Sequence, residues 1–183
     1  MNVLPPQSGD DDLEGAISHD LFRQVMASFV TGVTVVTTRS RGEIRGMTAN
    51  AFMSGSLDPP LCVISVGLTA RMHAHLIEAR HFGVNILARG QEELIHHFAG
   101  NPLERLDLKY EYAGKTPLFA HAYATLAAKV IARHPCGDHS LFVGHIFAMR
   151  RFEDVAPIVL HVGHLASLTH AQERRSDPIV SFW

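Results

Sequence analysis

Apolar positions near the start of the chain recur at helical spacing and are followed by an unbroken β-branched run. Ser18 precedes the spaced positions and can cap the first turn of a helix. The apolar members of this pattern are Leu21, Phe22, Val25, Met26 and Phe29. Gly32 is expected to end the helix, and residues 33–38 (VTVVTT) favour a strand because their side chains are stiff at χ1. After a polar turn at 39–42, residues 43–48 are expected to return as an antiparallel strand.

Further along, short apolar runs alternate with short helical patterns. Strands are predicted at 61–66, 82–87, 125–133, 139–150 and 157–162. One short helix is predicted after a Thr69 cap, with Met72, Leu76 and Ile77 on one face, and another over 91–98. Residues 99–117 read as an irregular excursion. Because turns rather than long crossover helices join the strands, the pattern favours a mainly β fold, an antiparallel barrel with short helices packed outside.

Length and composition indicate one ordinary globular domain with appendages. We expect an acidic N-terminal tail over residues 1–17, a domain over 18–170 and a C-terminal extension over 171–183. A formal charge of −2 gives no indication of a nucleic-acid surface. No apolar run reaches the roughly 20 residues of a membrane span, and the start of the chain lacks the pattern of a secretory signal. The sequence therefore predicts a cytoplasmic protein with no membrane contact, and its two cysteines are expected to be reduced thiols.

The segment from Gly46 to Pro60 is the first candidate for chemistry. Residues 46–54 (GMTANAFMS) place small and hydroxylated residues between two predicted strands, with glycines that allow close approach of the backbone. Thr48, Asn50 and Ser54 offer the donors and acceptors that a planar heteroaromatic ring edge needs. The same composition is also typical of a turn that only connects two strands. Neither a phosphate-binding P-loop nor a G-x-G-x-x-G fingerprint is present.

A set of motifs in a fixed order changes this balance. GVTVVTT (32–38), GMTANAFMSGSLDPPLCVISVG (46–67), FGVNIL (82–87), HFAG (97–100) and CGDHSLFVGHI (136–146) follow one another along the chain. In this order and at these separations they resemble the short-chain flavin reductases, the reductase partners of two-component flavin-dependent monooxygenases. The resemblance covers about residues 19–168. It implies a split β-barrel of Greek-key type and a homodimer with flavin bound near the interface.

The resemblance also implies the residues of the site. Those expected to contact the cofactor are Thr34, Met47, Thr48, Ala49, Asn50, Ser54, Ser65, Val66, Gly67, Thr69, Arg71, Phe98, Gly137 and Asp138. Among them, Thr69 and Arg71 are the expected phosphate contacts, where a helix N-terminus and a guanidinium suit an anion. His139, in the GDH triplet, is the expected catalytic residue and lies against the incoming nicotinamide.

The activity implied is hydride transfer from NADH or NADPH to FMN or FAD, with reduced flavin passed to a partner monooxygenase. The protein mainly positions the two rings in such chemistry. The sequence does not choose between the two flavins or between the two nicotinamide cofactors, because no ribose-reading acidic residue sits in a recognised fingerprint.

Two other interpretations of the function stay open. A flavin-binding electron carrier or sensor on the same fold would carry the same cofactor motifs. The histidines suggest a metal in H-x-H (73–75), H-x-C-x-x-H (134–139) and H-x-x-H (161–164), although residues i and i+2 of a helix point apart, and we predict no metal. Two further segments carry structural expectations. The apolar segment Ile179–Trp183 is expected to pack on the barrel or across a dimer interface.

The two cysteines differ in their predicted surroundings. Cys62 is expected to be buried and inert, whereas Cys136 lies in a turn.

Overall fold

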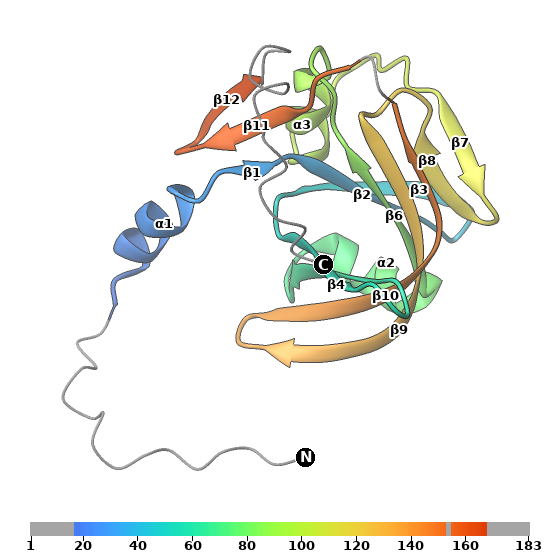
Figure 1. Ribbon diagram of the computed structural model, residues 1–183, viewed down its shortest axis with the longest axis horizontal. Helices are drawn as coiled ribbons and strands as arrows, with labels where there is room; N and C mark the ends of the chain where they lie inside the picture. Colours follow the sequence, from blue (N-terminus) through green and yellow to red (C-terminus); the bar gives the residue numbers. More distant parts are fainter. Residues whose placement is uncertain (1–16, 153–154, 168–183) are drawn as a thin grey trace, which may run out of the picture.

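The computed structural model describes residues 17–152 and 155–167 (Figure 1). The predicted tail (1–17, apart from Ile17) and the predicted extension (171–183) lie outside these residues. The main element is a seven-stranded antiparallel sheet in the order β3-β2-β6-β9-β10-β5-β4. Its strands are β2 (Thr34–Ser40), β3 (Glu43–Ala49), β4 (Phe52–Ser56), β5 (Leu61–Gly67), β6 (His81–Ile86), β9 (Ala124–Cys136) and β10 (His139–Arg151).

The sheet curls because its two edge strands are consecutive in the chain. If it were flat, β3 and β4 would lie about 29 Å apart, at about 4.8 Å for each strand spacing. Only Asn50 and Ala51 join the two strands, and a link of that length spans at most about 11 Å. The sheet therefore bends round into an open barrel, and its edges approach each other at this link (Figure 1).

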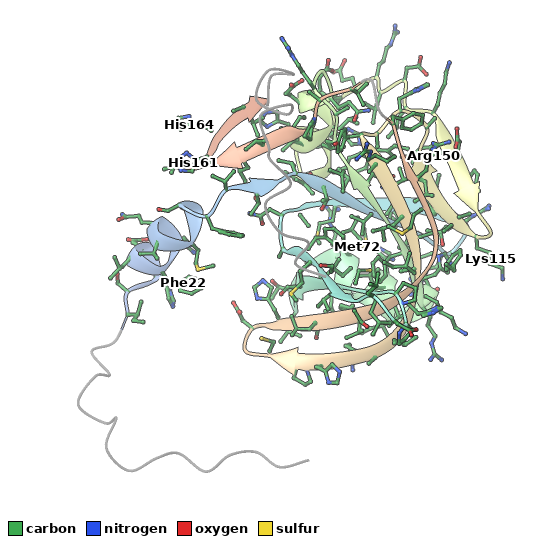
Figure 2. All side chains as sticks on the ribbon, viewed as in Figure 1. Phe22, Met72, Lys115, Arg150, His161 and His164 are labelled. Atoms are coloured by element: carbon green, nitrogen blue, oxygen red, sulfur yellow. The ribbon has the colours of Figure 1, made fainter. Side chains whose placement is uncertain are left out.

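Two apolar clusters cover the two faces of the sheet. The inner cluster includes Val36, Ile64, Phe82 and Phe142. Helix α2 (Arg71–Ala79) adds buried Met72 and Leu76 to it, so this helix closes one end of the curved sheet, and Figure 2 shows Met72 within the curve. The outer cluster lies beneath α3 (Glu92–Phe98) and the hairpin of β7 (Tyr110–Ala113) and β8 (Thr116–Phe119), and it includes Val35, Leu87 and Phe119.

A buried amide connects three strands on the outer face. Asn85 of β6 is fully buried, and its Nδ2 donates to the Val35 carbonyl at 2.9 Å and to Thr37 Oγ1 at 3.1 Å. Its Oδ1 accepts from the Phe119 backbone N–H at 2.7 Å. Because every hydrogen-bonding group of this amide has a partner, it fixes β8 against the sheet at little cost of burial.

The N-terminal helix stands apart from the sheet. Helix α1 (His19–Ala27) begins at Ser18, whose Oγ accepts from the Leu21 N–H at 3.2 Å, which confirms the predicted cap. The chain after α1 enters a small sheet in the order β1-β11-β12, which consists of β1 (Thr31–Gly32), β11 (Ile158–His161) and β12 (His164–Ser167). The C-terminal end of α1 contacts this sheet, because the Ala27 carbonyl accepts from the Val162 N–H at 3.0 Å. None of the residues of α1 is buried.

The structure corrects three local expectations. Within 46–60, residues 52–56 form the strand β4, which was not predicted, between the end of β3 and a turn over 57–60. Residues 99–117 contain β7 and the start of β8. The cap of α2 is Ala70 rather than Thr69, and no side chain bonds to the first turn of that helix; Ile77 is about half exposed. Within the described residues no helix is long and apolar enough to span a bilayer.

Candidate functional site

A groove of about 760 Å³ lies between α1 and the outer face of β4, β5 and β10. Val63, Ser65 and Leu141 contribute its floor, and the β3–β4 link contributes one wall. The opposite wall is apolar and comes from α1 and the residues after it, including Phe22 and Met26. Figure 2 shows Phe22 on this projecting helix. The volume falls within the usual range of small-molecule sites, roughly 300–1,000 Å³.

The strand register extends the groove floor to His139. Ser65 pairs with Leu141, and two residues further along each strand Gly67 pairs with His139. Because alternate residues of a strand share a face, Gly67 and His139 continue the row that Ser65 and Leu141 begin. The His139 ring lies beside Gly67, where an added Cβ would be 3.7 Å from Nε2. The predicted catalytic histidine thus lies on the same face of the sheet as the groove floor, beyond the residues that line the groove.

The GDH triplet is the tip of the β9–β10 hairpin. Cys136 and His139 are its closing pair, and Gly137 has a φ of 58°, which suits glycine at the first position of a two-residue turn. The Asp138 carbonyl accepts from the Leu68 N–H at 2.9 Å and so ties the hairpin tip to the end of β5. The Asp138 Oδ1 accepts from His139 Nδ1 at 2.7 Å.

This side-chain contact fixes the state of Asp138. The hydrogen bond from His139 lowers the pKa of the Asp138 carboxyl, and attraction to the His139 ring and, further off, to His19 acts in the same direction. The carboxylate is therefore ionised at neutral pH and acts only as an acceptor. It holds Nδ1 of His139 and leaves Nε2 directed toward other partners.

The β3–β4 link is held firmly at the groove wall. Thr34 Oγ1 donates to the Ala49 carbonyl at 2.6 Å, and the Ser65 N–H donates to the Ala51 carbonyl at 3.1 Å. The Phe52 N–H donates to the Asn50 carbonyl at 2.9 Å. These bonds fix the backbone, and Asn50, exposed, lines the groove together with Thr34 and Ser65.

Several predicted residues lie away from this groove. Thr48 Oγ1 donates to the Ile95 carbonyl at 2.8 Å, which joins β3 to α3. Phe98 packs on Gly46 and stacks on Phe119 with ring centroids 5.6 Å apart. Neither residue lines the groove, and the contact of each with a ligand stays a prediction.

Three others contribute mainly to the framework. Val66 is buried in the inner cluster, so only its backbone could meet a ligand, and Met47 packs against the same cluster. Ser54 pairs with the buried Cys62 and therefore lies on the opposite face of β4 from Met53, which lines the groove. The role of each in binding stays a prediction.

The expected phosphate contacts follow the groove floor in the chain. Thr69 and Arg71 are both exposed, just after Gly67, and Arg71 is the first residue of α2. Because Ala70 offers no side-chain cap, the first N–H groups of this helix have no side-chain acceptor.

Sequence reasoning missed one wall of the groove and one hydroxyl. The apolar spacing of α1 was recognised, but not that its side chains are exposed and form the apolar wall. Thr31 lines the groove, and its Oγ1 is buried with no hydrogen-bond partner among the described residues. An unpaired buried hydroxyl next to a groove is the kind of group that a bound ligand can satisfy after a side-chain rotation. In the sequence, Thr31 differs from other threonines only in standing next to Gly32, which does not indicate a buried, unpaired hydroxyl.

The histidine motifs do not form a common metal site in the described part of the chain. His73 Nε2 lies 2.9 Å from Ser140 Oγ, and His75 Nδ1 lies 3.0 Å from Ser40 Oγ, so the two rings of the H-x-H pair contact different strands. Burial, and then the charge of Arg133, lowers the pKa of His73. Within the described part of the chain, no group of three or more His, Cys, Asp or Glu side chains is placed to hold a metal.

Comparison with known proteins decides the family. A family model described as flavin reductase like domain matches residues 26–169. The chain belongs to the flavin reductase-like family. An NADH-dependent flavin reductase from Rhodococcus sp is 39% identical over 149 residues, which cover 80% of this chain and 84% of that protein. The reductase component of 4-hydroxyphenylacetate 3-monooxygenase from Thermus thermophilus is 39% identical over 140 residues, with coverage of 76% and 90%.

Solved structures of the same family superpose on this fold. The flavin reductase PheA2 matches with a TM-score of 0.79 and 37% identity, covering 84% of this chain and 100% of its own. The Streptomyces globisporus NADH:FAD oxidoreductase SgcE6, in complex with NAD and FAD fragments, matches with a TM-score of 0.77 and 35% identity, over 84% of this chain and 94% of its own. The mainly β architecture predicted from the sequence is confirmed.

The groove fits the flavin that this family implies. Val63 and Leu141 in its floor and the α1 wall are apolar, as the faces of a tricyclic ring require, and Thr34, Asn50 and Ser65 add polar groups to the lining. The unpaired Thr31 hydroxyl adds a fourth polar group in the wall. When bound, a flavin would supply the hydride-accepting ring at this position.

Proposed function

We propose that this chain is an NAD(P)H-dependent flavin reductase that transfers hydride from a nicotinamide to FMN or FAD. The observation that carries the proposal is the groove between α1 and β4, β5 and β10, which combines apolar and polar lining residues and lies on the same sheet face as His139. Relatives named as NADH-dependent flavin reductases support the same activity.

The chain's own residues act by positioning. The bonds of Thr34 and Ser65 to the carbonyls of Ala49 and Ala51 fix the backbone on either side of Asn50, so a flavin ring edge would meet polar groups on a fixed backbone. Thr69 and Arg71 are proposed to hold the phosphate of the flavin nucleotide beyond the groove floor.

His139 is proposed to orient the nicotinamide. Asp138 accepts from Nδ1 and fixes the ring plane, and Gly67 leaves the space beside Nε2 open. A donor or acceptor fixed at this end can hold the carboxamide so that the two rings stack, and such orientation supplies much of the rate in a reaction between two bound rings.

Steady-state oxidation of NADH and NADPH, each with FMN, FAD and riboflavin, tests the proposal. We expect rapid turnover of a purified protein that is nearly colourless, since flavin would come and go as a substrate. A tightly bound yellow cofactor with no oxidation of NADH when free flavin is added would contradict it and support the electron-carrier alternative.

A partner monooxygenase is proposed as the consumer of reduced flavin. Proteins named as reductase components of 4-hydroxyphenylacetate 3-monooxygenase and of a flavin-dependent trigonelline monooxygenase are 39% and 36% identical to this chain over the matched residues. We expect reduced flavin released by this chain to support a flavin-dependent oxygenase held behind a dialysis membrane. Failure across the membrane but success on mixing would show that the transfer needs contact.

A homodimer is proposed from exposed apolar residues on the sheet. Ile131, Phe147 and Met149 of β9 and β10 are each more than half exposed, and Met53 of the edge strand β4 is similarly exposed. Such exposure is unusual for a monomer and typical of an interface. Sedimentation equilibrium should show a dimer that Phe147→Ser weakens; a monomer at all concentrations would contradict the proposal.

A further inference from the structure

The apolar wall of the groove is uncovered in the described part of the chain. Phe22 and Met26, four residues apart on one face of α1, are 58% and 54% exposed, and Phe29 beyond the helix is 71% exposed. All three line the groove. A cluster of large apolar side chains this exposed in a groove indicates a surface that another segment or molecule covers.

The described chain ends close to this wall. β12 pairs with β11, which pairs with β1, and Thr31 of β1 lines the groove. Thr31 lies opposite Leu160, which lies opposite Leu165, so Leu165 of β12 is two strand spacings from the groove, about 10 Å. The chain leaves β12 at Ser167, two residues further on.

The sequence after Ser167 has the length and composition of a tethered apolar anchor. Residues 168–178 include the polar run Gln172–Asp177 and end at Pro178, and Ile179, Val180, Phe182 and Trp183 follow. Eleven residues span at most about 40 Å when extended, several times the distance to the groove. A short tether also holds its end at a high effective concentration near the groove, which favours an intramolecular contact over a second molecule.

We propose that Ile179–Trp183 docks on the apolar wall of the groove in its own chain, against Phe22, Met26 and Phe29. Aromatic side chains pack well against a thioether and against other rings, and these are the groups that the wall presents. The docked segment would cover the wall that a flavin ring face would otherwise contact, so the docking is measured without flavin. This docking rests on the groove and the tether, and it stands or falls independently of the proposed reductase activity.

Trp183 makes the docking measurable in the intact chain because it is the only tryptophan. Without flavin, we expect its emission to be blue-shifted and acrylamide quenching to be severalfold weaker than in the chain unfolded in guanidinium. Met26→Gln should raise the quenching toward the unfolded value. Val25→Gln is the matched control, since Val25 is 60% exposed on the same helix but does not line the groove.

The outcomes separate the possible occupants. Equal quenching in the native and unfolded chains would overturn the proposal, and so would equal effects of Met26→Gln and Val25→Gln. Shielding that disappears on dilution would overturn it in favour of a second copy of the chain. Circular dichroism checks that α1 survives each change; should Met26→Gln unfold the helix, Phe29→Gln, outside the helix, makes the same test, and an unchanged Trp183 there would overturn the proposal.

Discussion

His139 sits where a backbone turn, a carboxylate and a glycine meet. Replacing it with alanine removes the ring and leaves the turn intact, because Gly137 and the Asp138 carbonyl make the turn's contacts. We expect His139→Ala to lower kcat/KM for NADH by about 10–100-fold, since misplaced reactants lose the rate that orientation supplies. Flavin affinity should change by less than about 3-fold, because the flavin contacts proposed at Asn50 and Ser65 remain.

Stopped-flow reduction at varied NADH and flavin titration in the absence of NADH measure the two effects separately. His96→Ala is a suitable control, because His96 is exposed on α3, away from the groove. If NADH kinetics stay normal in His139→Ala while flavin affinity falls, the histidine belongs to the flavin site instead.

The two cysteines should differ sharply in reactivity. Cys62 is fully buried, and burial raises its pKa from 9.0 to about 11, whereas Cys136 is exposed at the hairpin. Because the thiolate is the reactive form, a thiol reagent at pH 8 should modify one thiol per native chain and two in denaturant. In the native Cys136→Ser variant the count should fall to zero; one rapidly reacting thiol there would contradict the burial of Cys62.

The same raised pKa predicts a pH dependence. The folded-state pKa of Cys62 lies above its unfolded value, so its contribution to stability is fully present below about pH 9 and is lost as pH rises through about 11. Urea unfolding of the Cys62→Ala variant should show a smaller loss of stability over this interval than the unmodified chain.

At the scale of elements, the contact between β3 and α3 depends on the absence of a side chain. A Cβ at Gly46 would lie 2.4 Å from the Phe98 ring. We expect Gly46→Ala to destabilise the fold by about 1–3 kcal/mol, because the ring must move against Phe119. Gly32→Ala is the control, since nothing lies within 4 Å of a Cβ there, and it should change stability by less than about 0.5 kcal/mol.

Urea denaturation measures both changes. Combining Gly46→Ala with Phe98→Leu should cost less than the sum of the single changes, because the smaller side chain leaves room for the new methyl group. Strict additivity would show that the ring and the glycine are not in contact.

What the sequence could predict of these elements follows their chemistry. The strand at 33–38 and the strand at 61–66 were predictable because runs of β-branched and apolar residues encode them locally. β4 (Phe52–Ser56) was missed, since FMSGS has no regular alternation and its strand form depends on pairing with β5. The α2 cap was placed at Thr69 because a hydroxyl is the usual cap, but the helix begins after an alanine.

The candidate site was predictable in part for a similar reason. Motif order grouped Asn50, Ser65 and His139. Strand register puts Ser65 and His139 on one face of the sheet, and Asn50 lines the same groove as Ser65, while their contact with a ligand stays a prediction. No local signal revealed that Phe22 and Met26 would form a groove wall, because an amphipathic helix reads the same whether its apolar side meets a core or an open groove. The sequence likewise shows Asn85 only as a polar residue within a predicted strand. It does not indicate that the amide hydrogen-bonds to backbone groups of β2 and β8.

At the scale of the whole molecule, the curled sheet links stability to ligand binding. The edges β3 and β4 meet at Asn50–Ala51, so a flavin bound there would brace the closure of the barrel. A ligand at 100 times its Kd adds about 2.7 kcal/mol to stability. For a chain of this size that corresponds to a rise in Tm of about 5–10 °C.

Comparing FMN with riboflavin tests where the phosphate binds. If Arg71 holds the phosphate, Arg71→Gln should reduce the rise in Tm caused by FMN and leave the smaller rise caused by riboflavin unchanged, because riboflavin carries no phosphate. Arg89→Gln is a matched control: it removes the same charge from an exposed site between β6 and α3. Differential scanning fluorimetry at equal ligand concentrations makes the measurement. Equal losses in the two variants would show that FMN responds only to overall charge, and equal losses for the two ligands would place Arg71 at the ring instead of the phosphate.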